Sequence, residues 1–169
     1  VSSSSERLLL KSLGSWIGAL TVARNRPRLR RDLDLKELLL DAYSNGRLIA
    51  VVPFVSKVLI PSRLSRIFKP SNPWLLAILR LLKEIYIVPD LKLNVKFELP
   101  LLTKALGVEA NDIEKSDLLR ARPAPVRDGN PAFTAIKREA GMASPIRSPS
   151  PSSSPVHSRQ EAFVSNSLS

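Results

Sequence analysis

The sequence predicts an all-α fold in which antiparallel helices pair and stack as a solenoid. Apolar residues recur every three or four positions through most of residues 1–120, the spacing of helices that bury one side. Start and stop signals divide this region into helices of about 10 to 20 residues with short connections. Because no two segments show the alternation of paired strands, a sheet is not expected.

The first helix is expected over residues 6–25. Its apolar stripe lies at helical spacing, and Ser3 with Glu6 has the spacing of a capping box. Gly14 and Gly18 lie four residues apart on one face of this helix. Without side chains there, another helix could approach closely, so we expect ordinary helix packing at this face.

A second helix is expected to follow the capping residue Asp34 and to end near Ser44, before Asn45-Gly46. Residues 47–59 are apolar and rich in Val and Ile, which leaves a strand possible. However, Pro53 could not occupy the middle of a sheet. A kinked, buried helix is therefore the prediction for this segment.

Further helices are expected toward residue 119. A short turn is predicted over residues 62–68, and Asn72-Pro73 then forms a strong start for a helix that reaches about residue 88. Another helix is predicted over 95–106, where a glycine stops it, and 112–119 is expected to add a last turn.

Residues 121–169 have the composition of a disordered Ser/Pro-rich linker, so the folded domain is expected to span residues 1–120. Four serines in the linker each precede a proline, which is the context of proline-directed kinases. The candidate phosphorylation sites are Ser144, Ser148, Ser150 and Ser154.

Residues suited to catalysis are sparse, and the sequence predicts neither an enzyme nor a metal or cofactor site. There is no cysteine, and the single histidine, His157, lies in the predicted linker. Asp32 and Asp34 are better placed to cap a helix than to act as a carboxylate pair. No apolar run reaches the roughly 20 residues that span a bilayer, so no membrane partner is expected.

The net charge is +11, which makes contact with RNA or with acidic protein surfaces plausible. One basic group surrounds the first inter-helix loop: Arg24, Arg26, Arg28, Arg30 and Arg31. A second group follows the buried helix: Lys57, Arg63, Arg66 and Lys69. Because no aromatic residues are interleaved with these charges as a stacking platform, protein contact is favoured over direct RNA binding.

Seven sequence blocks, in order, resemble one family, and the similarity covers about two-thirds of the chain. The blocks are LGSWIG (13–18), ARNRP (23–27), DLDLK (32–36), LLLDAY (38–43), VVPFVSKVL (51–59), FKPSNPW (68–74) and DLKLNVKFE (90–98). The family is the large scaffold subunit of the CCR-NOT mRNA deadenylase complex, in its domain similar to the middle domain of initiation factor four-G.

The resemblance implies a partial HEAT-like solenoid, since the family's first helical hairpins would precede Val1. It implies a non-catalytic scaffold that binds a DEDD-family deadenylase, other CCR-NOT subunits and, separately, a DEAD-box RNA helicase. Poly(A) shortening, mRNA decay and translational repression would follow. The expected location is cytoplasmic, including mRNA-decay granules, with the nucleus as a second compartment, and any contact with RNA would be indirect.

Candidate partner-binding residues are the polar ones beside the familiar blocks: Arg24, Arg26, Arg28, Lys57, Lys69, Asn72 and Trp74. For Asn72 and Trp74, helix capping and packing are the favoured roles. Pro100 departs from the family pattern and is expected to kink the last long helix. Two alternatives remain: a helicase-binding middle domain of another translation or splicing factor, and a basic helical-repeat module that binds RNA directly.

Overall fold

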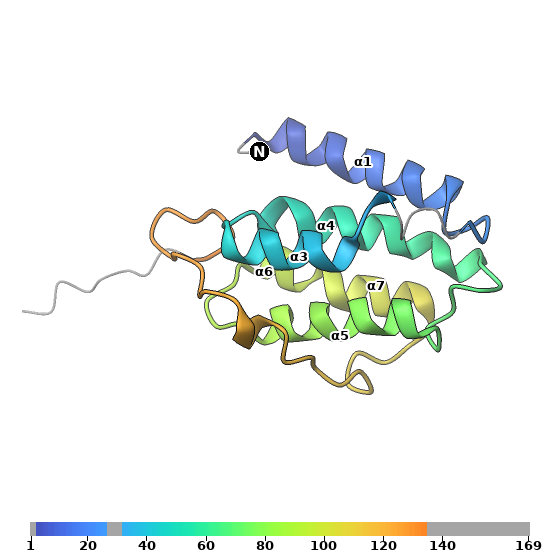
Figure 1. Ribbon diagram of the computed structural model, residues 1–169. Coiled ribbons are helices and arrows are strands. Elements are labelled where there is room, and N and C mark those ends of the chain that lie inside the picture. Colours follow the sequence, from blue (N-terminus) through green and yellow to red (C-terminus); the bar gives the residue numbers. More distant parts are fainter. Residues whose placement is uncertain (1–2, 27–31, 135–169) are drawn as a thin grey trace, which may run out of the picture. The chain divides into compact units, whose positions relative to one another are not determined.

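The computed structural model describes residues 3–26 and 32–134, which form a stack of helices (Figure 1). The α-helices are α1 (Ser4–Leu20), α3 (Leu35–Ser44), α4 (Leu48–Leu59), α5 (Pro73–Ile87), α6 (Leu93–Lys96) and α7 (Glu98–Leu106). Two 3-10 helices span Ile60–Leu64 and Leu119–Ala121. Within the described residues the only β feature is an isolated bridge between Leu91 and Phe133, so the all-α prediction is confirmed.

Helix α4 occupies the centre of the stack. It packs against α1, α3, α6 and α7, while α5 packs against α3 and α7 (Figure 1). Every residue of α4 except Lys57 is buried, which explains why this segment is apolar all round. The helix continues through Pro53, so the predicted buried helix is confirmed and the strand alternative is not.

The two glycines of α1 form its contact with α4. A Cβ atom at Gly14 would lie 2.7 Å from the carbonyl oxygen of Phe54, and one at Gly18 would lie still closer to that of Val58. Since real Cβ atoms do not approach a carbonyl oxygen so closely, only glycine permits this packing. The predicted close approach of another helix is confirmed, and that helix is α4.

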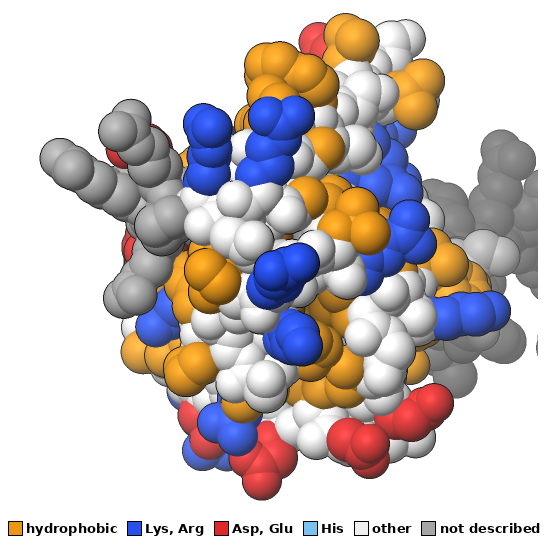
Figure 2. Space-filling view, turned by 90° about the vertical axis from the view of Figure 1, so that its right-hand side faces the viewer, with side chains coloured by type: hydrophobic (Ala, Val, Ile, Leu, Met, Phe, Trp, Pro, Cys, Tyr) orange, Lys and Arg blue, Asp and Glu red, His pale blue; other side chains and the backbone are white. Residues whose placement is uncertain are grey.

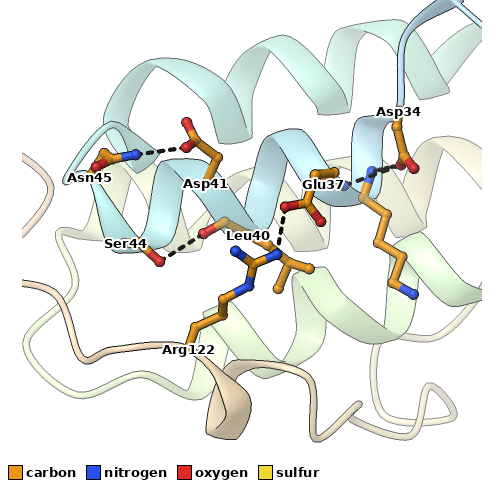
Figure 3. A network of polar contacts seen from close by, with 8 residues as sticks. Asp34, Glu37, Leu40, Asp41, Ser44, Asn45 and Arg122 are labelled. Carbon is orange, nitrogen blue, oxygen red and sulfur yellow. Dashed lines mark hydrogen bonds and ion pairs between the residues drawn. The ribbon is translucent and has the colours of Figure 1, made fainter.

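Side-chain caps begin α1, α3 and α5 where the sequence placed them. The Ser3 side chain accepts a hydrogen bond from the Ser5 amide, and the Asp34 carboxylate accepts from the amides of the second and third residues of α3 (Figure 3). Gly46 has φ +70°, the left-handed conformation expected after α3. Helix α1 ends at Leu20 rather than at residue 25. The chain continues in turns, in which the Ala23 amide donates to the Gly18 carbonyl, and Asn25 then takes a left-handed φ of 57°.

Three of the later predictions require correction. The single helix expected over 95–106 is two helices that meet at Phe97, and Pro100 is the third residue of α7. The interruption at Phe97 follows Lys96, the residue four positions before Pro100. A proline ring displaces that carbonyl and removes its hydrogen bond, so the disturbance expected from Pro100 is a break between α6 and α7 rather than a kink within one helix. The turn expected over 62–68 is instead the 3-10 helix Ile60–Leu64, after which the Ser65 hydroxyl accepts from two amides in place of helical carbonyls.

The helical turn expected over 112–119 does not form there, because backbone amides of this segment donate to a side-chain carboxylate of α5 instead of to helical carbonyls. Glu84 of α5 accepts hydrogen bonds from the amides of Leu118 and Leu119, at 3.0 and 3.1 Å, and from the Ser116 hydroxyl. The 3-10 helix Leu119–Ala121 forms only after these contacts.

The packed part of the chain continues past residue 120. Ala132 and Phe133 are buried, and the amide of Lys92 donates to the Ala132 carbonyl at 2.9 Å. Arg122 pairs with Glu37 of α3 (Figure 3), and Arg127 pairs with Asp90 at 2.7 Å. These contacts place 122–134 with the helices rather than with a linker; the four Ser-Pro serines and His157 lie outside the described residues.

Replacing Glu84 with alanine is expected to lower the free energy of unfolding by about 2–3 kcal/mol, because three donors lose a charged acceptor. Urea denaturation of the full chain measures this loss in the free energy of unfolding. The matched control is Glu114→Ala, which removes only an exposed ion pair with Arg80 and is expected to cost less than about 0.5 kcal/mol. Equal effects of the two substitutions would show that Glu84 does not anchor the C-terminal segment.

Candidate functional site

The two basic groups seen in the sequence meet at one end of the helical stack, the right-hand end in Figure 1. The loop after α1 carries the first group, and the loop after α4 carries the second. We call the exposed residues of these loops the basic loop surface: Arg24, Arg26, Arg63, Leu64, Arg66, Ile67 and Lys69.

The side chain of Asn25 holds the two loops together. Its Oδ1 atom accepts hydrogen bonds from the Ser65 hydroxyl at 2.7 Å, the Arg66 amide at 2.9 Å and the Ile67 amide at 3.1 Å. Ser65 is buried and also accepts from the Phe68 amide at 2.8 Å. Because the backbone is fixed in this way, arginines from sequence positions about 40 apart are presented side by side.

Asn72 and Trp74 support this surface from within. The Asn72 side chain caps α5 by accepting from the Trp74 amide at 2.9 Å and donates to the Ile67 carbonyl at 3.1 Å. The Trp74 ring packs edge-on against the buried Phe68 ring, with centroids 5.3 Å apart. The favoured capping and packing interpretation of these two residues thus agrees with the contacts they make, whereas a partner-binding role for them stays a prediction.

Trp74 also lines a cavity of about 400 Å³ between the starts of α3 and α5. The other lining residues are Asp34, Lys36, Pro73, Ala77 and Ile78. The cavity is mainly apolar, and Asp34 already uses its carboxylate to cap α3.

The charges of the basic loop surface have no carboxylate partner in the described part of the chain. The ion pairs between described residues lie elsewhere: Lys11–Glu98, Arg80–Glu114, Arg120–Asp117, Arg122–Glu37 and Arg127–Asp90. Figure 2 faces this end of the molecule and shows Lys and Arg side chains spread among hydrophobic ones. Most of the visible acidic side chains lie along the lower edge, with others at the top and left edges. Within the described residues, the positive charge of this surface is therefore not paired with a carboxylate.

The other predicted site residues are placed differently. Lys57 is partly buried in the last turn of α4, where its Cβ lies beside Gly14 of α1. Arg28, with Arg30 and Arg31, lies outside the described residues. Of the seven predicted partner-binding residues, the structure brings Arg24, Arg26 and Lys69 onto the basic loop surface.

Sequence reasoning missed the aliphatic part of this surface and its clamp. Leu64 is 69% exposed and Ile67 is 57% exposed, within the segment where only a short turn had been predicted. The available signal was Asn25 itself, since asparagine is common where a helix ends in a left-handed residue. No local sequence pattern indicates that the side-chain oxygen of Asn25 accepts hydrogen bonds from a loop about 40 residues later.

Substitution of Asn25 is expected to loosen both loops. Asn25→Gly keeps access to the left-handed φ and removes only the three hydrogen bonds, for a cost of about 1–2 kcal/mol. Asn25→Ala also strains the backbone and is expected to cost about 1 kcal/mol more. Urea denaturation measures both effects, and if neither variant loses stability, Asn25 does not clamp the loops.

Among the described residues, no three His, Cys, Asp or Glu side chains are grouped as a metal site would require. In the same part of the chain, no helix has both the length and the apolar content to cross a membrane.

Comparison with known proteins decides the family. Residues 1–128 match the family model described as the CCR4-NOT transcription complex subunit 1 CAF1-binding domain. The chain belongs to this family. The resemblance read from the seven sequence blocks is confirmed.

Three similar proteins are named as subunits of the CCR4-NOT complex or of a general negative regulator of transcription. The chain is 48% identical over 118 residues to the CCR4-NOT transcription complex subunit let-711 of Caenorhabditis elegans, which covers 69% of the chain and 4% of that protein. It is 48% identical over 118 residues to general negative regulator of transcription subunit 1 of Schizosaccharomyces pombe, covering 70% of the chain and 6% of that protein. The Saccharomyces cerevisiae protein of the same name is 39% identical over 110 residues, covering 65% and 5%. The chain therefore spans only a small part of the length of these relatives.

Proposed function

We propose that this chain is a non-catalytic scaffold segment that docks a DEDD-family deadenylase of the CAF1 type. The observation that carries the proposal is the match of residues 1–128 to a family described as a CAF1-binding domain. A scaffold of this kind accelerates poly(A) shortening, and with it mRNA decay and translational repression, because it raises the concentration of nuclease near a recruited mRNA.

The basic loop surface is the proposed contact for the nuclease. Its cations are exposed and carry no carboxylate partner within residues 3–26 and 32–134, so an acidic partner surface could approach without breaking an existing ion pair. Asn25 and Ser65 already fix the backbone, so binding orders little of the chain. Lys57 and Arg28 remain candidate contacts at the margin of this surface.

A DEAD-box RNA helicase and other CCR4-NOT subunits are the further proposed partners. This part of the proposal rests on the family resemblance. A scaffold of mRNA decay would act in the cytoplasm, including mRNA-decay granules, and also in the nucleus.

The alternative partner is a helicase without any nuclease, as in a middle domain of a translation or splicing factor. A pull-down separates the two. The full 169-residue chain is immobilised and offered a purified CAF1-type deadenylase and a purified DEAD-box helicase, separately and together. We expect the chain to retain the nuclease both when the nuclease is offered alone and when it is offered together with the helicase. Retention of the helicase alone would overturn the proposed function.

The absence of catalysis is tested in the same preparation. The chain alone is expected to leave a polyadenylated RNA unchanged, whereas the chain bound to the deadenylase shortens it. Shortening by the chain alone, undiminished after further purification, would contradict the scaffold role.

A further inference from the structure

We propose that the basic loop surface recognises an acidic protein segment in which leucine or isoleucine alternates with aspartate or glutamate, rather than RNA. This inference rests on the proposed function only in taking the basic loop surface as the docking site. It names the chemistry of the partner and gives the exposed aliphatic side chains of this surface, Leu64 and Ile67, a part in recognising it.

Charge sets the first requirement on the partner. Five exposed cations, Arg24, Arg26, Arg63, Arg66 and Lys69, lie on two loops that Asn25 joins. None forms an ion pair with a described carboxylate, and the ion pairs present lie on other elements. A partner with clustered carboxylates is therefore drawn to this end of the molecule and held in one orientation.

Exposed aliphatic side chains set the second requirement. Leu64 separates Arg63 from the loop that carries Arg66, and Ile67 follows Arg66 directly. Both side chains stand more than half exposed, with 69% and 57% of their surface accessible. Apolar groups of the partner placed between the arginines would remove this surface from water, which purely ionic contacts would not do.

The same residues are poorly suited to single-stranded RNA. RNA readers without sequence preference stack bases on exposed aromatic rings. Here Phe68 is only 7% exposed, and the Trp74 ring is occupied by its edge-on contact with Phe68. Phosphates could pair with the arginines, but the Leu64 and Ile67 side chains would then stay exposed to water and would not contribute to binding.

Preorganisation is the third feature. The amides of Arg66 and Ile67 are fixed by Asn25, and the Ile67 carbonyl is fixed by Asn72. The spacing between the aliphatic and basic side chains is thus set before binding, which favours a partner with a matching short repeat of acidic and apolar residues.

The test is a binding assay of the full chain against synthetic 12-residue peptides. One set alternates Glu or Asp with Leu or Ile, a second set replaces the aliphatic residues with Ser, and a third replaces the acidic residues with Lys. Fluorescently labelled oligo(A) of 20 nucleotides is the RNA probe. We expect only the first set to bind measurably, and oligo(A) neither to bind comparably nor to displace it.

Variants locate the binding on the surface. Arg63→Glu with Arg66→Glu is expected to weaken binding of the first peptide set at least tenfold, and Leu64→Ser with Ile67→Ser about fivefold. The control, Lys115→Glu with Arg120→Glu, makes the same charge change at exposed positions and is expected to leave affinity within twofold. Circular dichroism confirms that each variant is folded.

Equal binding of the first and second peptide sets would overturn the inference. So would binding of oligo(A) that competes with the peptides and does not change in the Leu64→Ser, Ile67→Ser variant. The peptide assay needs no nuclease, so its failure is distinct from failure of the deadenylase pull-down.

Discussion

Substituting Gly18 with leucine is expected to lower the free energy of unfolding of this chain by about 3 kcal/mol. The added side chain meets the Val58 carbonyl and Pro61, which belong to the backbone and to a rigid ring, so neither can rotate away. Helix α1 must then move off α4. Urea denaturation followed by far-UV circular dichroism measures the loss, and the midpoint falls accordingly.

The matched control for Gly18 is the adjacent residue of the same helix. Ala19 is exposed, so Ala19→Leu adds a similar side chain to α1 without entering the contact with α4. Its effect is expected to stay within about 0.5 kcal/mol. Comparable losses at the two positions would indicate that α1 does not pack against α4 through its glycine face.

Charge reversal at Arg24 and Arg26 is expected to weaken binding to the CAF1-type deadenylase at least tenfold. Both side chains are exposed on the loop that Asn25 fixes, so the substitutions change the charge of the surface while leaving the core intact. Two glutamates in their place would repel the acidic partner surface that the proposal requires. Titration calorimetry with the full chain measures the affinity.

The control for this pair is again Lys115→Glu with Arg120→Glu, which gives the same net charge at exposed positions on another segment. A loss of affinity that is equal in both double variants would mean that net charge alone matters. In that case the basic loop surface would not be the contact. Raising the salt concentration should also weaken wild-type binding more than it weakens the Arg24→Glu, Arg26→Glu variant.

Much of the fold follows from local signals in the sequence. Asp34 and Asn72 cap the helices that they were expected to cap, because their side chains accept from amides two or three residues later. Gly46 and Gly107 both take the left-handed φ of 70° where helices were expected to end. The glycines of α1 could be assigned to helix packing because their spacing places them on one face.

The errors arise where a distant residue supplies a hydrogen-bond partner. Glu84 takes the amides of Leu118 and Leu119, so the expected last turn of helix does not form over 112–119. The burial of Phe133 and its bridge to Leu91 joins segments about 40 residues apart, and composition alone assigned that stretch to a linker. Such contacts depend on the tertiary fold and have no local signature.

The candidate site was predictable in composition and not in arrangement. The sequence contained both basic groups, and the resemblance pointed to a docking role. The two basic groups come together because the side-chain oxygen of Asn25 binds the second loop. Aliphatic side chains lie among the charges because the 3-10 helix ends at Leu64. The sequence made Asn72 and Trp74 candidates for partner binding as well as for helix capping and packing. Their contacts in the structure are those of a helix cap and a packed ring.

Docking of a deadenylase by this chain can be measured by calorimetric titration of a purified CAF1-type deadenylase into the full 169-residue chain. We expect saturable binding with one nuclease per chain, weakened by the Arg24→Glu, Arg26→Glu variant. Absence of binding by a chain whose circular dichroism shows that it is helical and cooperatively folded would contradict the account.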